Sequence, residues 1–194
     1  IITFLKSMRK KAKPLLIAAN KADLCDDLKI LEKISKTFKV IPSSAETELL
    51  LKKATKAKLI DYVPGDDNFS GKDNVELSEQ QNNALHLAKN VLTKIQTTGV
   101  QEILNSLIFD VLDMIIVYPV EDETKLINKQ GQVLPDARLL KNGSTAKELA
   151  FTIHQDIGNG FLYAIDAKTK KRIGADYQLK NGDIIKIVST QSRG

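Results

Sequence analysis

The chain has 194 residues, of which 42% are hydrophobic and 27% are charged, so it carries enough apolar material for a packed core. Its 10 glycines and 5 prolines exclude collagen-like and low-complexity classes, and its apolar content argues against a wholly disordered chain. The net charge of +5 is unevenly spread: residues 1–60 carry 14 basic and 6 acidic side chains, residues 61–114 carry 3 and 9, and residues 115–194 carry 12 and 9. This alternation of sign predicts three structural units.

Cysteine usage and hydropathy limit the environment of the protein. The single cysteine, Cys25, excludes a disulfide framework and a cysteine-based zinc site, and it fits a reducing, cytoplasmic compartment. The longest apolar stretches, such as 114–120, fall far short of the roughly 18 residues that span a bilayer, so we expect no membrane partner. The chain opens on Ile1 within a hydrophobic pattern, and we therefore expect it to be a fragment of a longer protein.

The first 60 residues alternate between strand and helix patterns. We expect a helix that ends at Pro14, a strand at 15–19, a helix at about 28–37, a strand at 38–41 and a helix that opens with a capping box of Ser43 and Glu46. The first of these strands is continuously apolar, as in a parallel strand that is buried on both faces. The order strand, helix, strand therefore predicts an α/β fold with a parallel sheet.

The middle of the chain is expected to be helical. Residues 61–74 are polar and turn-forming, which predicts a boundary loop. One helix then begins at a capping box of Ser78 and Gln81, and a second, at 100–111, follows Gly99. These two helices either form an antiparallel pair or pack onto neighbouring domains.

The last part of the chain predicts a small α+β domain. We expect strands at 115–118, 161–166 and 184–188, and one helix that Thr145 and Glu148 cap and that Gly158 and Gly160 end. Strands that enclose a single helix within so short a segment are typical of the α+β class.

The most informative motif is Asn20-Lys21-Ala22-Asp23, which directly follows the apolar strand at 15–19. An open parallel sheet binds ligands at the carboxyl ends of its strands. A carboxylate at Asp23 can accept hydrogen bonds from N1–H and the 2-amino group of guanine, whereas adenine has no donor at either place. Asn20 would brace the loop, and the stem of Lys21 would cover the face of the base. The alternative is an ordinary strand-end turn with solvated side chains.

A second motif, Ser43-Ser44-Ala45, follows the next predicted strand. In a guanine-binding arrangement, such a loop offers the backbone N–H of Ala45 to O6 of guanine, where adenine has a donor instead. The alternative is simple helix capping by Ser43, and both can hold because they use different groups. The two motifs in this order favour guanine recognition over a chance match.

These motifs resemble those of known families. Asn-Lys-Ala-Asp and Ser-Ser-Ala resemble the fourth and fifth guanine-nucleotide motifs of translation-factor GTPases. The stretch from Met8 onward resembles the YchF or Obg-like ATPase group of Obg-related GTPases, especially its archaeal members. The segments VYPVEDETKL, LPDARLL, GSTAKELAFTIHQDIG and LKNGDIIKIV resemble a TGS domain, a β-grasp module.

The resemblance implies an organisation and a set of ligands. It implies the C-terminal part of a P-loop-type G domain at 1–60, a linker and helical segment at 61–113, and a TGS domain at 114–194. It also implies GTP as the ligand, Mg²⁺ held by residues outside this chain, and a ribosome, rRNA or tRNA contact through the TGS domain.

The sequence lacks a phosphate-binding loop of the form Gly-x-x-x-x-Gly-Lys-Ser/Thr. The nearest match runs from Gly65 to Asp73, with the wrong spacing and no hydroxyl. We therefore expect no catalytic residue and no metal ligand in this chain, and no hydrolysis by the chain alone, although the parent protein resembles a GTPase.

Two weaker groups of candidates lie in the last segment. His154 matches a histidine that related TGS domains associate with RNA contacts; the alternative is a boundary histidine that bonds to a nearby loop. Lys168, Lys170, Lys171 and Arg172 cluster around a predicted turn and are candidates for binding RNA phosphates. A solvated charged face accounts for them equally well, because no aromatic residues are interleaved with them for base stacking.

The sequence leaves two functions open. In the first, the chain is the C-terminal part of a GTPase with a ribosome-associated or translation-related task. In the second, it is a non-catalytic module that binds RNA or protein, and its G-domain remnant serves only as a scaffold. Affinity for guanine nucleotides distinguishes the two.

Overall fold

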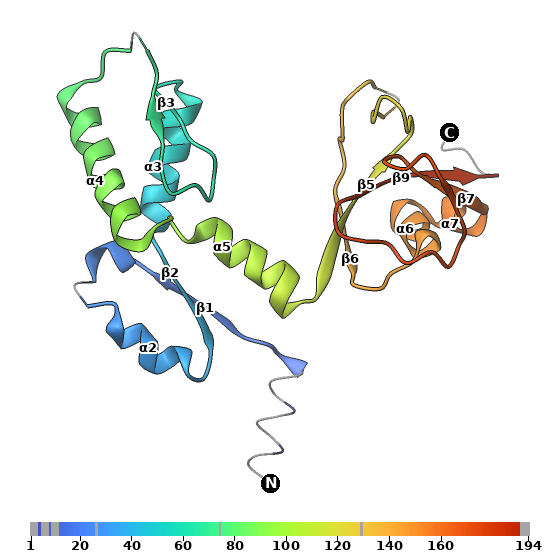
Figure 1. Ribbon diagram of the computed structural model, residues 1–194, viewed down its shortest axis with the longest axis horizontal. Coiled ribbons are helices and arrows are strands. Elements are labelled where there is room, and N and C mark those ends of the chain that lie inside the picture. Colours follow the sequence, from blue (N-terminus) through green and yellow to red (C-terminus); the bar gives the residue numbers. More distant parts are fainter. Residues whose placement is uncertain are drawn as a thin grey trace. The chain divides into compact units, whose positions relative to one another are not determined.

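The computed structural model describes residues 12–25, 27–73, 75–128 and 130–190, together with Phe4 and Met8. The chain forms two compact units, Ile1–Leu107 and Ile108–Gly194 (Figure 1). The helix expected before Pro14 lies largely outside the described residues. Within the described ranges, no helix has both the length and the apolar content to cross a membrane.

Unit 1 begins with two parallel strands. Its elements are β1 (Leu16–Asn20), the short 3₁₀ helix η1 (Ala22–Leu24), α2 (Lys29–Ser35), β2 (Lys39–Ser43), α3 (Ala45–Lys56), β3 (Ile60–Asp61), β4 (Ser70–Gly71), α4 (Glu79–Ile95) and α5 (Val100–Asn105). β1 and β2 pair in parallel, with Asn20 opposite Ser43. The strand, helix, strand prediction of an α/β fold is confirmed, and both carboxyl ends lie at the same edge of the sheet.

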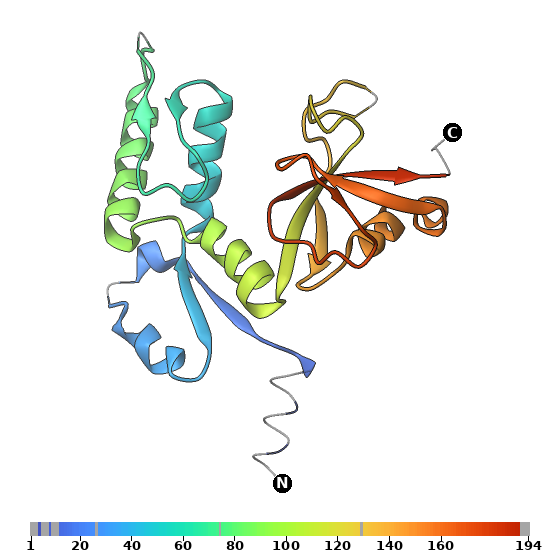
Figure 2. The ribbon, with the colours of Figure 1, turned by 45° about the vertical axis from the view of Figure 1, so that its right-hand side comes forward.

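Helix α4 packs against α3 rather than forming an isolated pair with α5 (Figure 1, Figure 2). The shared core contains Leu51, Ile60, Tyr62, Ala88 and Leu92. The capping box that begins α4 is confirmed in both directions. Because this core includes residues on either side of position 60, the first expected domain boundary falls within a packed region, and the three-part division remains a prediction.

Two local predictions for unit 1 are wrong. The N-cap of α3 is Ser44, whose hydroxyl accepts from the Thr47 N–H, and not the predicted pair of Ser43 and Glu46. Ser43 remains in β2 because the parallel ladder with Asn20 extends to it. The predicted boundary loop at 61–74 is also interrupted, because β4 lies within it and forms a short antiparallel ladder with β3.

Unit 2 is a five-stranded mixed sheet with two short helices. After the π-helical segment η2 (Ser106–Val111), it contains β5 (Met114–Val120), β6 (Arg138–Lys141), α6 (Ala146–Ile153), α7 (Gln155–Asn159), β7 (Phe161–Asp166), β8 (Arg172–Ile173) and β9 (Asp183–Ser189). The strand order is β6-β5-β9-β7-β8, in which β5 and β9 are parallel and the other neighbours antiparallel. This confirms the predicted α+β architecture of the β-grasp type.

The core of unit 2 lies between the sheet and α6. Val117, Leu149, Ala164 and Ile185 are fully buried in one cluster. The predicted capping box of α6 is confirmed. The predicted single helix is wrong, because His154 takes an extended conformation (φ −163°, ψ 146°) that ends α6 and starts α7.

Candidate functional site

The Asn-Lys-Ala-Asp loop forms a tight turn at the end of β1. Lys21 has a left-handed backbone (φ 63°, ψ 32°), which turns the chain out of the strand and into η1. The Leu24 N–H donates to the Lys21 carbonyl at 3.1 Å and closes this turn. Ala22 is buried and anchors the loop, whereas Lys21 is exposed and Asp23 half-buried. The turn therefore leaves the two charged side chains of the motif accessible.

The Ser-Ser-Ala loop lies beside it at the end of β2. The parallel register brings the two strand ends together, and the Ala45 N–H donates to Asn20 Oδ1 at 3.1 Å. Ser43 and Ser44 are buried, and the Ser44 hydroxyl is engaged with Thr47 Oγ1 at 2.8 Å. Ala45 is thus the exposed residue of this loop, while the two serine side chains support the loop from within.

A buried polar network, which the sequence analysis missed, lies beneath the Ser-Ser-Ala loop. One carboxylate oxygen of Glu48 accepts from the Tyr62 hydroxyl at 2.7 Å and from the Thr98 hydroxyl at 2.6 Å. The Ser44 N–H donates to the Thr98 carbonyl at 2.9 Å. Burial and the hydrogen bond with Glu48 raise the pKa of Tyr62 above its usual range. The signal in the sequence was a glutamate three residues before Leu51, on the face of α3 that becomes buried.

The turn after α4 approaches β2 very closely. Gly99 has a left-handed backbone (φ 75°), and a Cβ atom built on it would lie only 2.0 Å from the carbonyl oxygen of Pro42. The Gly99 N–H donates to Thr97 Oγ1 at 3.0 Å, which stabilises the turn. Only glycine fits here without movement of the backbone, so this position fixes the end of α4 against the strand that carries the second motif.

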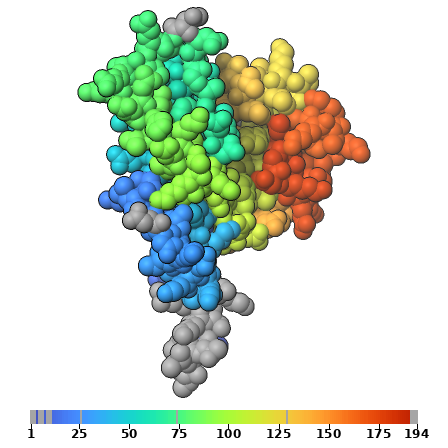
Figure 3. All heavy atoms as spheres, turned by 60° about the vertical axis from the view of Figure 1, so that its left-hand side comes forward, coloured from blue at the N-terminus to red at the C-terminus, as the bar shows by residue number. Residues whose placement is uncertain are grey.

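Helix α4 also contacts the first loop. The ammonium of Lys94 donates to the carbonyls of Asp23, at 3.1 Å, and Cys25, at 2.6 Å. In Figure 3 the blue surface of the β1–η1 region lies directly below the green surface of α4. A groove of about 370 Å³, lined by Asp23, Thr47, Lys94 and largely apolar neighbours, lies where η1, α3 and α4 meet. Asp23 therefore lies at the edge of a hollow whose walls come from three elements.

The basic candidates of unit 2 lie on the turn between β7 and β8 and differ in their surroundings. Lys170 donates from its ammonium to the Glu123 carbonyl, and the guanidinium of Arg172 stacks over the Tyr163 ring, 3.6 Å from its centroid. The side chains of Lys168 and Lys171 are exposed. Of the four predicted phosphate-binding residues, two are therefore engaged within the unit.

Asp166 determines the shape of this turn. Its carboxylate accepts from the Lys168 N–H at 2.9 Å and from the Thr169 hydroxyl at 2.7 Å. Burial raises the pKa of this carboxyl, but the hydrogen bonds from Thr169 and Lys168 outweigh it and lower the pKa overall. The ionised form of Asp166 thus holds Lys168 in its position on the turn.

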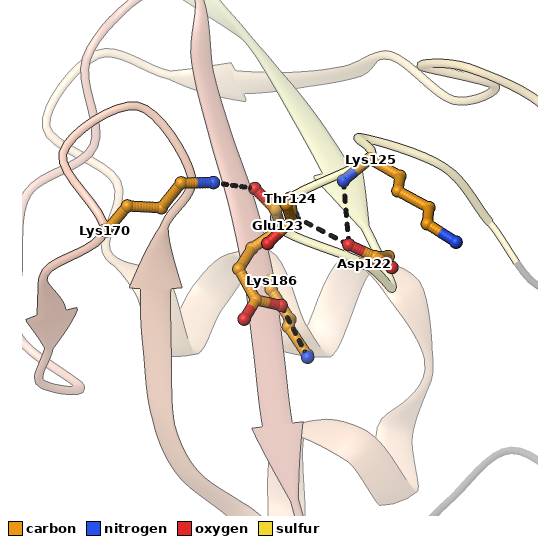
Figure 4. A network of polar contacts seen from close by, with 6 residues as sticks. All are labelled: Asp122, Glu123, Thr124, Lys125, Lys170 and Lys186. Carbon is orange, nitrogen blue, oxygen red and sulfur yellow. Dashed lines mark hydrogen bonds and ion pairs between the residues drawn. The ribbon is translucent and has the colours of Figure 1, made fainter.

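A second polar cluster fastens the loop after β5 to the sheet (Figure 4). The Lys186 ammonium pairs with the Glu123 carboxylate at 2.6 Å, and this bond lowers the pKa of Glu123. Backbone N–H groups of Lys125 and Thr124 donate to the Asp122 carboxylate and lower its pKa. Lys186 holds this loop against β9, and Lys170 joins it to the turn after β7, while the Asp122 contacts lie within the loop.

His154 caps a helix in this structure. Its Nδ1 accepts from the Asp156 N–H at 3.2 Å, and its ring is more than half exposed. The partner lies in the first turn of α7 and not in a nearby loop as the alternative expected, and an RNA role for His154 remains a prediction. Within the described ranges, no group of three or more His, Cys, Asp or Glu side chains is arranged to hold a metal ion.

Comparison with known proteins gives two family matches and two close relatives. Residues 18–122 match the domain described as Obg-like GTPase YGR210-like, G4 motif-containing, and residues 129–189 match the TGS domain. The chain is 53% identical over 192 residues to "Uncharacterized GTP-binding protein MJ1332" of Methanocaldococcus jannaschii, covering 97% of this chain and 48% of that protein. The crystal structure of a GTP binding protein from Pyrococcus horikoshii OT3 is 43% identical and similar with a TM-score of 0.70, covering 97% of this chain and 49% of that one. The chain thus spans about half the length of these relatives.

Proposed function

Because the chain belongs to the Obg-like GTPase YGR210-like, G4 motif-containing family, we propose that its β1–η1 and β2–α3 loops recognise the guanine base of GTP. The observation that carries this proposal is the hydrogen bond from the Ala45 N–H to Asn20 Oδ1. It joins the two motifs, 25 positions apart in the sequence, into one surface at the carboxyl edge of a parallel sheet, where such sheets bind ligands.

Three residues contact the base in this proposal. The Asp23 carboxylate accepts from N1–H and the 2-amino group, and the aliphatic stem of Lys21 covers one face of the ring. The Ala45 N–H meets O6, and it is shared between this oxygen and Asn20 Oδ1 in a three-centre hydrogen bond. Adenine would place an amino donor against the Ala45 donor, and it offers no N–H donor to Asp23.

The other three predicted residues act through the loop. Asn20 holds the Ala45 backbone, and the buried hydroxyl of Ser44 caps α3. Ser43 is buried in the last position of β2 and sets the register opposite Asn20. Their contribution to guanine binding is the shape of the site, not a direct contact.

Phosphate binding, Mg²⁺ and hydrolysis belong, in this proposal, to the full-length protein. The 194 residues contain no Gly-x-x-x-x-Gly-Lys-Ser/Thr sequence. The relatives that carry GTP-binding names are about twice as long as this chain. The chain therefore supplies the guanine-reading part of a GTPase.

Titration of the full-length protein with GTP, ATP and XTP tests the base assignment. The D23N variant replaces the acceptor opposite the 2-position by a donor, so its affinity should move from GTP toward XTP, whose 2-oxo group accepts. The wild type should prefer GTP to ATP. Equal affinity for GTP and ATP, or a D23N variant with unchanged base preference, contradicts guanine recognition by this loop.

We further propose that the TGS unit contacts RNA, in the form of a ribosome, rRNA or tRNA, in the cytoplasm. The exposure of Lys168 and Lys171 on and beside the turn after β7 supports this proposal, because exposed cations can reach RNA phosphates. The double variant K168A/K171A should bind RNA more weakly. The logarithm of its association constant should also fall less steeply with the logarithm of the salt concentration, by about 1–2 in the slope. The control pair K141A/K147A, exposed on other elements, should leave the slope unchanged. An unchanged slope in K168A/K171A would assign these lysines to a solvated face.

A further inference from the structure

Both base-reading loops are tied to a short segment that runs from Lys94, in the last turn of α4, to Thr98, in the connection that follows α4. Lys94 binds the Asp23 loop through two carbonyl groups. Thr98, four residues later, accepts from the Ser44 N–H with its own carbonyl and bonds to Glu48 with its hydroxyl. The two anchors therefore come from the same short segment, although it lies about 50 to 70 positions away from the loops in the sequence.

The Asp23 loop needs such an anchor because of its own geometry. η1 is only three residues long, and within it the Leu24 and Cys25 N–H groups donate to the carbonyls of Lys21 and Ala22. The carbonyls of Asp23 and Cys25 point beyond the end of this helix, where a cation is favourable. The Lys94 ammonium fills this position with two charge-assisted bonds, which are stronger than bonds between neutral groups.

Guanine recognition requires a fixed distance between the two loops. Asp23 must reach the N1 and 2-amino edge while Ala45 reaches O6 on the same rigid ring. We infer that Lys94 is a positioning residue for guanine specificity, holding the Asp23 carboxylate at the distance from the Ala45 N–H that the base edge demands. This inference rests on the proposed function, and in it Lys94 acts through the Asp23 loop that it holds.

The ratio of the dissociation constants for ITP and GTP is the appropriate measurement, made on the full-length protein. Inosine lacks the 2-amino group, so this ratio reports the contact of Asp23 with that group. Wild type should favour GTP, and D23A should bring the ratio close to one. K94M, which keeps the length of the side chain but removes its charge and donors, should lower the ratio by about threefold or more. K94R, which restores donors, should recover most of the wild-type ratio.

K89M is the matched control, because Lys89 is exposed on the same helix and lies a turn and a half away from Lys94. Its ratio should equal that of the wild type. Both nucleotides titrate the same folded fraction, so partial unfolding of a variant leaves the ratio untouched.

The outcomes separate the inference from the function on which it rests. If the wild type does not distinguish GTP from ITP and D23A changes nothing, guanine reading by Asp23 fails, and the inference fails with it. If D23A abolishes the preference but K94M retains it in full, the proposed function stands and Lys94 has no positioning role. A reduced ratio in K94M that K94R restores and K89M does not share supports the inference.

Discussion

Replacement of Gly99 by alanine tests how closely the end of α4 must approach β2. A Cβ atom at this position would lie 2.0 Å from the Pro42 carbonyl oxygen and 3.0 Å from Cα of Ser43, with φ at +75°. The left-handed backbone costs an alanine about 1–2 kcal/mol. The backbone movement that relieves the overlap adds about 1–3 kcal/mol. We therefore expect G99A to destabilise unit 1 by about 2–5 kcal/mol.

Gly65 provides the matched control within the same unit. Its φ is +99°, but the nearest atom to an added Cβ is Cγ of Gln101 at 3.1 Å, on a side chain that can move aside. G65A should therefore cost only the backbone part, about 1–2 kcal/mol. Native-state hydrogen exchange, resolved to the Ser44 amide that donates to Thr98, measures both variants in the relevant region. A G99A variant as stable as G65A would refute the close approach.

Two further predictions concern buried polar groups. T98V removes a donor from the buried Glu48 carboxylate and should cost about 1–3 kcal/mol in urea unfolding. T93V loses only an exposed hydrogen bond within its own helix, so it should lower the free energy of unfolding by clearly less. Equal losses in the two variants would show that the buried network does not stabilise unit 1. Because the hydrogen bonds of Asp166 lower its pKa despite burial, unit 2 should be most stable above the ordinary carboxyl pKa of about 3.9 and lose stability as the pH falls through the lower folded value. In D166N, the free energy of unfolding should fall less steeply as the pH is lowered. An unchanged dependence on pH would show that other carboxyl groups cause the loss of stability in acid.

Patterns within short stretches of the sequence were sufficient to predict individual strands and helix caps. The apolar run before Asn20 predicted a parallel strand, which is confirmed, but the expected burial of this strand on both faces is wrong, because every residue of β1 is half-buried or exposed. The capping boxes at Ser78 and Thr145 lie where their spacing placed them. Each of these features depends on residues within one turn or one strand. The order of the two guanine motifs after the two strands was readable for the same reason.

Long-range competition decided the positions where the predictions were wrong. Ser43 and Ser44 are both good N-caps, and only the pairing of β2 with β1 keeps the first of them in the strand. The break at His154 lies within a continuous helical pattern, which does not show that this residue ends α6 and caps α7. For Lys170, the sequence predicts either phosphate binding or a place on a solvated face, and it does not report the contact with the Glu123 carbonyl, 47 positions away.

The same distinction bears on how the two motifs work as a site. In the proposed site, Asp23 and Ala45 contact guanine, and their two loops are joined by the Asn20–Ser43 register of the parallel strands and by the hydrogen bond from the Ala45 N–H to Asn20 Oδ1. The remaining constraints come from the turn of α4 that holds Lys94 and from the Thr98 turn after it. A chain with both motifs intact and this turn altered would keep the donors and acceptors but lose their spacing. In the proposed site, base selectivity is therefore a property of the packed unit rather than of its motifs alone.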